Sequence, residues 1–123
     1  MSRGSSRRSD GGDAPESAEL RRLREEIDGL DRRIVGLLNE RAALARAVGE
    51  EKARLGRAIR DAAREREVLL RVSIANAGPT PQAALLAIYR KVVAAARELE
   101  ARERERLLHD EPEPPGDGEP PVA

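Results

Sequence analysis

The chain has 123 residues, and its 23 Lys and Arg balance its 23 Asp and Glu, so the formal net charge is zero. This balance gives no overall field for nucleic acid or a membrane surface, and neither is expected as a partner. Zero Cys excludes a disulfide scaffold and a thiol nucleophile and fits a cytoplasmic location. With one His, His109, metal or histidine acid–base chemistry is not expected, which leaves Arg, Lys, Asp, Glu and backbone.

Both ends of the chain are polar. Residues 1–17 are rich in Ser, Gly and charge without an apolar run, so we expect a disordered tail and neither a signal peptide nor an anchor. Residues 109–123 are rich in Pro, Gly and acid and are also predicted to be disordered. Residues 18–108 then form one domain, about the size at which a single-chain core is only marginally sufficient.

The first predicted element is a long helix from Ala18 to about Arg54. Apolar residues recur along it in the a and d pattern of a heptad, and no Pro interrupts them: Leu20, Leu23, Ile27, Leu30, Ile34, Leu37, Leu44 and Val48. At 1.5 Å per residue the helix is on the order of 55 Å long, which exceeds a compact core of this size. It therefore needs a partner, and a second copy of the chain is the simplest one.

Two more helices follow. Gly56 ends the first, and a second runs from about Ala58 to Ala75. In "NAGPTPQ" Gly78 and Pro79 break that helix, Thr80 is the expected N-cap, and a third helix runs from Pro81 to about Leu108. Expected core side chains include Leu70, Ile74, Ile88 and Val93. The fold class is all-α, with a long, a short and a long helix.

Basic residues interrupt the apolar lines of the first helix. Positions 20, 27, 34, 41 and 48 form one line in which only Arg41 is polar. Such an Arg commonly sets the register of a coiled coil while its head escapes to solvent. The neighbouring line begins with Arg24 and ends with Lys52, and each of these alone reads as a solvated surface charge.

Charges also extend apolar lines of the other two helices. Asp61, Arg64 and Glu65 share one side of the second helix, where the helix dipole and a solvated ion pair would explain them. Glu100 continues the line of Tyr89, Val93 and Ala96 on the third helix. By contrast, Arg97 and the "RERER" at 102–106 are expected to be solvated helix surface.

The combination indicates a pocket. Three helices each place charges where the apolar pattern predicts contact, and buried charges are costly unless they are paired or matched to a ligand. A group of three bases and two or three acids would suit a small anionic, hydroxylated molecule.

The sequence resembles the all-α, AroQ-type (type II) chorismate mutase family over about residues 18–101. The resemblance is carried by "LRRLREEIDGLDRRIVGLLNERAALARAVGEEK", then "RDAAREREVL", then "IYRKVVAAARELE". It implies an intertwined homodimer of three-helix protomers in which the first helix is shared between two active sites. That implication agrees with a first helix too long for its own chain.

The resemblance also implies a role for each site residue. Arg24 would act in trans in the partner's site and Arg41 in its own, and together they would hold the substrate's two carboxylates. Lys52 would face the ether oxygen of the breaking bond, with Glu100 on its other side. Glu65 would bind the ring hydroxyl beside Asp61 and a supporting Arg64. The pocket walls would be Val48, Val68, Val93 and Ala96.

The implied reaction, chorismate to prephenate, is a unimolecular Claisen-type rearrangement in phenylalanine and tyrosine biosynthesis and needs no cofactor. A catalyst has only to hold the folded conformer and stabilise charge on the ether oxygen. Two positions depart from the family. Glu100 stands where many relatives have Gln, and a carboxyl donates only when protonated. Ala96 stands where some relatives have a carboxylate-binding Ser.

Several alternatives stay open at this point. The same fold serves isochorismate pyruvate lyase and 4-amino-4-deoxychorismate mutase, and Glu65 beside Asp61 could meet either substrate. A non-catalytic helical dimer that serves as a regulatory or scaffolding module is the alternative from another class. Some small family members are activated by an enzyme of the same pathway, so a partner of that kind is a further alternative.

Overall fold

The computed structural model describes residues 14–110 and contains three helices: α2 (Ala18–Leu55), α3 (Ala62–Ala75) and α4 (Gln82–Asp110). No strand occurs within this range, so the all-α prediction is confirmed. The tails were predicted at residues 1–17 and 109–123, and most of each, residues 1–13 and 111–123, lies outside the described residues. The chain divides into two units, one up to Asn39 and one from Glu40, and each is considered by itself.

Helix α2 matches the predicted long helix to within one residue at its end. It begins where the Leu20 backbone N–H donates to Ser17 Oγ at 3.0 Å, an N-cap bond that satisfies one of the free N–H groups of the first turn. It ends at Gly56, whose φ of +69° is left-handed and favours glycine. Among the helices of residues 14–110, none is both long and apolar enough to cross a membrane.

Helix α3 starts later than predicted, since residues 57–61 are not helical. Asp61 is its N-cap and accepts the Arg64 backbone N–H at 3.0 Å on Oδ1. An N-cap residue has extended backbone itself, and its side chain satisfies a free N–H of the first turn, so Asp61 marks the boundary between the connector and the helix. The Ile59 carbonyl, which a helix would have used internally, accepts a hydrogen bond from Lys52 Nζ at 2.8 Å.

Helix α4 begins one residue later than predicted and ends two residues later. Pro81, not Thr80, precedes its first residue and accepts the Leu85 N–H at 3.0 Å on its carbonyl. The Asn76 amide ties the turn together by donating to Thr80 O and Gln82 Oε1. The last turn continues because Arg106 pairs with Asp110 at 3.2 Å, so His109 lies in the helix.

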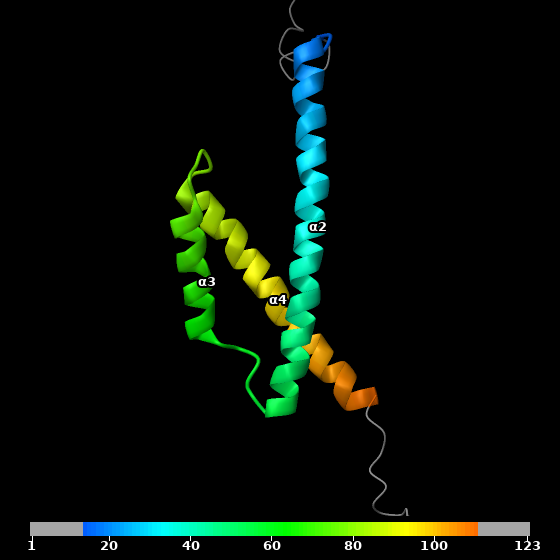
Figure 1. The fold of residues 1–123 in the computed structure, drawn as a ribbon, viewed down its shortest axis with the longest axis vertical. Helices are drawn as coiled ribbons and strands as arrows, with labels where there is room; N and C mark the ends of the chain where they lie inside the picture. Colours follow the sequence, from blue (N-terminus) through cyan, green and yellow to red (C-terminus); the bar gives the residue numbers. More distant parts are fainter. Residues whose placement is uncertain (1–13, 111–123) are drawn as a thin grey trace, which may run out of the picture. The chain divides into compact units, whose positions relative to one another are not determined.

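The second unit contains the core. In Figure 1, a turn joins α3 to α4, and the two helices pack against each other in opposite directions. The C-terminal end of α2 crosses α4. The crossing is close, because a Cβ built on Gly49 would lie 2.8 Å from Glu100 Cα. Ala45 and Val93 are buried there. Leu70, Ile74 and Ile88, expected in the core, are instead exposed in this single chain.

Glu103 is buried, although the 102–106 run was expected to be solvated. Its carboxylate lies 3.6 Å from Arg46 Nε of α2 and 2.6 Å from Arg106 Nη2 of α4. The Arg106 hydrogen bond, with Arg46 nearby, holds the pKa of Glu103 below its ordinary value of 4.5 despite the burial. A paired carboxylate can therefore sit at the α2–α4 crossing.

The heptad side chains of α2 are exposed in the single chain. Each has at least 39% of its surface accessible: Leu20, Leu23, Ile27, Leu30, Ile34, Leu37, Leu44 and Val48. A continuous apolar row of this kind on one helix is typical of a surface that pairs with another chain.

Candidate functional site

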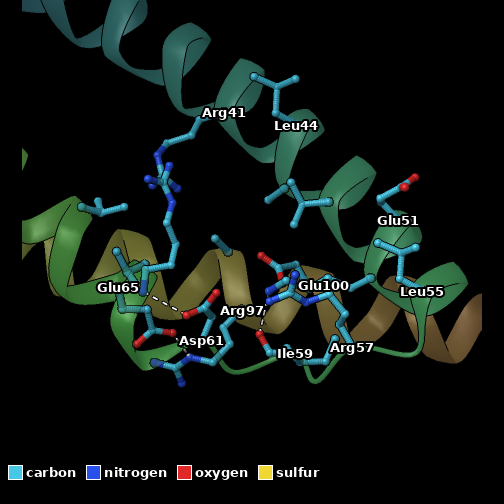
Figure 2. Close-up of a pocket in the computed structure, with 17 residues that line it drawn as sticks. Arg41, Leu44, Glu51, Leu55, Arg57, Ile59, Asp61, Glu65, Arg97 and Glu100 are labelled. Carbon is cyan, nitrogen blue, oxygen red and sulfur yellow. Dashed lines mark hydrogen bonds and ion pairs between the residues drawn. The ribbon is translucent and has the colours of Figure 1, made fainter.

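A cavity of about 510 Å³ lies in the second unit, within the size range of small-molecule sites. Its lining comes from α2, the 56–61 connector, α3 and α4 (Figure 2). Ten of the eleven site residues expected from the sequence line it: Arg41, Val48, Lys52, Asp61, Arg64, Glu65, Val68, Val93, Ala96 and Glu100. The fold thus brings together charges that lie up to 59 positions apart (41 to 100).

Lys52 and Glu100 form the most buried ion pair of the cavity. Lys52 Nζ donates to Glu100 Oε1 at 2.8 Å, and the two side chains are 17% and 13% exposed. The same ammonium donates to the Ile59 carbonyl, so two of its three protons have fixed acceptors. A third proton remains for an oxygen in the cavity.

Gly49 lets this pair form. It lies three residues before Lys52 on α2 and contacts the backbone of Glu100 directly, so the two helices approach without a side chain between them. One turn of helix then carries the Lys52 stem from the crossing point to the Glu100 carboxylate.

Arg41 reaches into the cavity from α2, in the direction of α3 (Figure 2). Its guanidinium carbon lies 5.8 Å from the centre of the Tyr89 ring, a cation–π distance. The aromatic face limits the side chain's freedom without using its N–H donors. Those donors form a planar fork suited to a carboxylate.

Asp61, Arg64 and Glu65 line the cavity at the start of α3, but each has a different task. Asp61 caps the helix, and Arg64 Nη1 pairs with Glu67 at 2.9 Å. That Arg64 hydrogen bond lowers the pKa of Glu67. Glu65 instead pairs across to α4, where Arg97 Nε donates to its Oε2 at 2.9 Å.

Arg97 was expected to be solvated surface, and that prediction is wrong. It lines the cavity and is 35% exposed. It lies four residues after Val93 and three before Glu100, so helical spacing alone placed it on the cavity face. The sequence did not reveal this position, because a lone Arg is expected in solvent and its ion-pair partner, Glu65, lies 32 positions away in the chain.

Other lining residues were also not anticipated. Apolar ones extend the aliphatic walls around the predicted valines: Leu44, Ala45, Leu55 and Ile59. Glu51 and Arg57 add charge at the end of α2 and in the connector. Leu44 and Leu55 carried a usable signal, since they follow the heptad and helical spacing of α2, whereas the connector residues depended on where α3 begins.

Arg24 belongs to the first unit, where it pairs with Glu16 at 3.0 Å. Its expected role in a second copy's site remains a prediction.

The chemistry available in the cavity is electrostatic. Arg41 and Lys52 offer donors to an anion, Glu100 and Glu65 offer acceptors, and the surrounding walls are largely aliphatic. Such surroundings lower the local dielectric and strengthen each charged contact relative to water. The arrangement can hold a small anion that also carries a hydrogen-bond donor.

Comparison with known proteins places the candidate site residues within the region of a known family. The family model for chorismate mutase type II matches residues 23–101, and the chain belongs to that family. The matched range contains every residue discussed above as a candidate ligand contact.

Two individual proteins similar to this chain are also named as chorismate mutases. A bifunctional chorismate mutase/prephenate dehydratase of Aquifex aeolicus (strain VF5) is 42% identical over 88 residues, which is 68% of this chain and 24% of that protein. The chain thus spans about a quarter of that relative's length. The structure of chorismate mutase (form II) from Thermus thermophilus superposes with a TM-score of 0.67 and 32% identity, over 68% of this chain and 96% of that one.

Proposed function

We propose that the chain catalyses the rearrangement of chorismate to prephenate. In this reaction the ether C–O bond to the ring breaks while a C–C bond forms between the enolpyruvyl methylene and the ring, with no atom gained or lost. The observation that carries the proposal is the convergence of Arg41, Lys52 and Glu100 in one aliphatic cavity of a chorismate mutase family member.

Each charged side chain has a task in this proposal. Arg41 binds a substrate carboxylate through its guanidinium fork, which favours the folded conformer in which the reacting carbons meet. Lys52 points its third ammonium proton at the ether oxygen, where negative charge develops. Glu100 faces the same oxygen, and Glu65 accepts a hydrogen bond from the ring hydroxyl. No nucleophile, metal or cofactor takes part.

The active form in this proposal is a homodimer in which Arg24 of each chain binds the second carboxylate in the other chain's site. The exposed apolar row along α2 supports this, because covering it with a second copy would remove it from water. The chain acts in the cytoplasm in this proposal, since a protein without Cys needs no oxidising compartment.

A depletion assay on the purified chain tests the activity, with chorismate, isochorismate and 4-amino-4-deoxychorismate as separate substrates. We expect prephenate from chorismate. We expect Arg41→Ala to lower kcat/KM by about 10²–10³-fold, by analogy with removal of one transition-state donor. Arg90→Ala is the matched control, since Arg90 is exposed on α4 and does not line the cavity.

The other outcomes identify the alternatives. Release of pyruvate from isochorismate with no prephenate from chorismate would assign the chain to the lyase reaction. No turnover of any substrate, with Arg41→Ala altering only stability, would make it a non-catalytic helical dimer.

A further inference from the structure

Glu65 is a carboxylate with two cationic neighbours. Its Oε2 accepts from Arg97 Nε at 2.9 Å, and its Oε1 lies 3.4 Å from Arg60 Nε. The Glu65 side chain is 19% exposed. Each of its oxygens has a second lone-pair direction, so the group can still accept a hydrogen bond while its negative charge is compensated.

The two cations differ in their effect on the cavity. Arg60 is 61% exposed and does not line the cavity, so water screens its charge. Arg97 lines the cavity and is fixed on α4 beside Ala96. Arg97 is therefore the cation that a ligand near Glu65 would meet.

The other charges at this end do not reverse the balance. Asp61 and Arg64 both line this end with opposite charges, so together they add no net charge. One Asp61 oxygen accepts the Arg64 backbone N–H, and the Arg64 guanidinium pairs with Glu67, which does not line the cavity. Glu65 and Arg97 are the other two charges at this end, and they form an ion pair between α3 and α4.

We propose that Arg97 is a specificity-determining residue that makes the Glu65 end of the cavity accept a neutral hydroxyl and disfavour an ammonium. A hydroxyl can donate to Glu65 without adding charge. An ammonium at the same place would gain little from a carboxylate already paired with a guanidinium, and it would lie close to that guanidinium, which repels it. The proposal rests on the proposed function and selects chorismate over its 4-amino-4-deoxy relative.

The test uses Arg97→Met, which keeps the aliphatic stem and removes the charge. The quantity measured is the ratio of the inhibition constant of 4-amino-4-deoxychorismate to the KM of chorismate. We expect the wild-type ratio to exceed about ten and Arg97→Met to lower it at least about tenfold, the effect of one uncompensated charge contact. Arg97→Lys, which keeps a cation, and Arg90→Met, outside the cavity, should leave the ratio near its wild-type value.

Glu65→Gln provides a second measurement if Arg97→Met does not fold. Removing the carboxylate leaves the Arg97 charge uncompensated, so the ratio should rise, while the amide oxygen still accepts from a hydroxyl. A wild-type ratio below about ten, or a ratio unchanged in both Arg97→Met and Glu65→Gln, overturns the role of Arg97 alone. Absence of chorismate turnover by the wild type overturns the proposed function and this inference together.

Discussion

Glu100 accepts a hydrogen bond from Lys52, yet the proposed reaction offers it an ether oxygen that can only accept. A carboxyl group donates to such an oxygen only when it carries a proton, whereas a glutamine amide donates at any pH. The ionised form would instead place negative charge beside the oxygen on which negative charge develops.

We therefore expect Glu100→Gln to raise kcat, because its amide can donate to the ether oxygen and no longer places a carboxylate beside it. The measurement is kcat for both proteins, with Glu98→Gln as a control on the exposed side of the same helix. A kcat unchanged in Glu100→Gln would mean that residue 100 does not act on the ether oxygen.

At the scale of single residues, the sequence predicted most of the side chains that line the cavity but not the ion pairs between them. Arg41 and Glu100 stood out because each interrupts or extends an apolar line, whereas Lys52 was singled out only through its combination with them and the family resemblance. Arg97 was not, since an Arg in a helix that is turning polar looks solvated unless its partner is known. The Glu65–Arg97 pair joins two helices and has no local spacing that could reveal it.

At the scale of elements, the crossing of α2 and α4 depends on Gly49. We expect Gly49→Ala to destabilise the protein by about 1–3 kcal/mol, because its Cβ would overlap the Glu100 backbone and force the helices apart. Activity should fall further than stability does, since the Lys52–Glu100 pair spans the same crossing. Urea unfolding at fixed protomer concentration and kcat measure the two effects.

Gly36→Ala is the matched control for Gly49→Ala. A Cβ at Gly36 meets nothing within 4 Å, and the position lies two residues from Ile34, off the a and d seam. There the substitution should stabilise the helix by up to about 1 kcal/mol, the ordinary helix preference of Ala over Gly. Equal effects at Gly49 and Gly36 would show that the crossing is not close.

The buried Glu103 links the same crossing to pH. Its pKa is lowered in the folded protein, so the stability it contributes is present above its unfolded value of about 4.5 and is lost as the pH falls through the lower folded value. We expect the melting temperature of the wild type to drop more steeply on acidification below about pH 4.5 than that of Glu103→Gln. Parallel curves would mean that the pair with Arg106 adds no stability.

Helix boundaries were predictable where one signal dominated. The unbroken heptad without Pro set the length of α2, and Gly56 set its end. The start of α3 was misplaced by four residues because Ala58 and Ile59 suit a helix locally. The Asp61 cap and the hydrogen bond from Lys52 to the Ile59 carbonyl, a contact from another element, determine the actual start.

At the scale of the whole molecule, the exposed heptad row is the feature that the single chain does not explain. The proposed homodimer covers it. The proposed role of Arg24 in the other chain's site can be tested by activity, which a measurement of stability alone could not do. Arg24→Ala and Lys52→Ala should each abolish most activity alone, since each removes one charge from every site.

Mixing the two variants after unfolding and refolding together should restore activity. In a mixed dimer, the chain with intact Lys52 receives intact Arg24 from the other chain, so one site in two is complete. Random pairing then gives about a quarter of the wild-type activity. If Arg24 acted within its own chain, every site would lack one charge, and the mixture would stay as inactive as its parents.

Lys52 is fastened at two places, to the Glu100 carboxylate on α4 and to the Ile59 carbonyl in the connector. One ammonium thus holds together three segments that meet around the cavity, much as a bound ion does. Replacing Lys52 would remove a cavity charge and also release the Ile59 carbonyl in the connector that leads to the Asp61 cap. A loss of rate in a Lys52 variant would therefore combine an electrostatic effect with an architectural one.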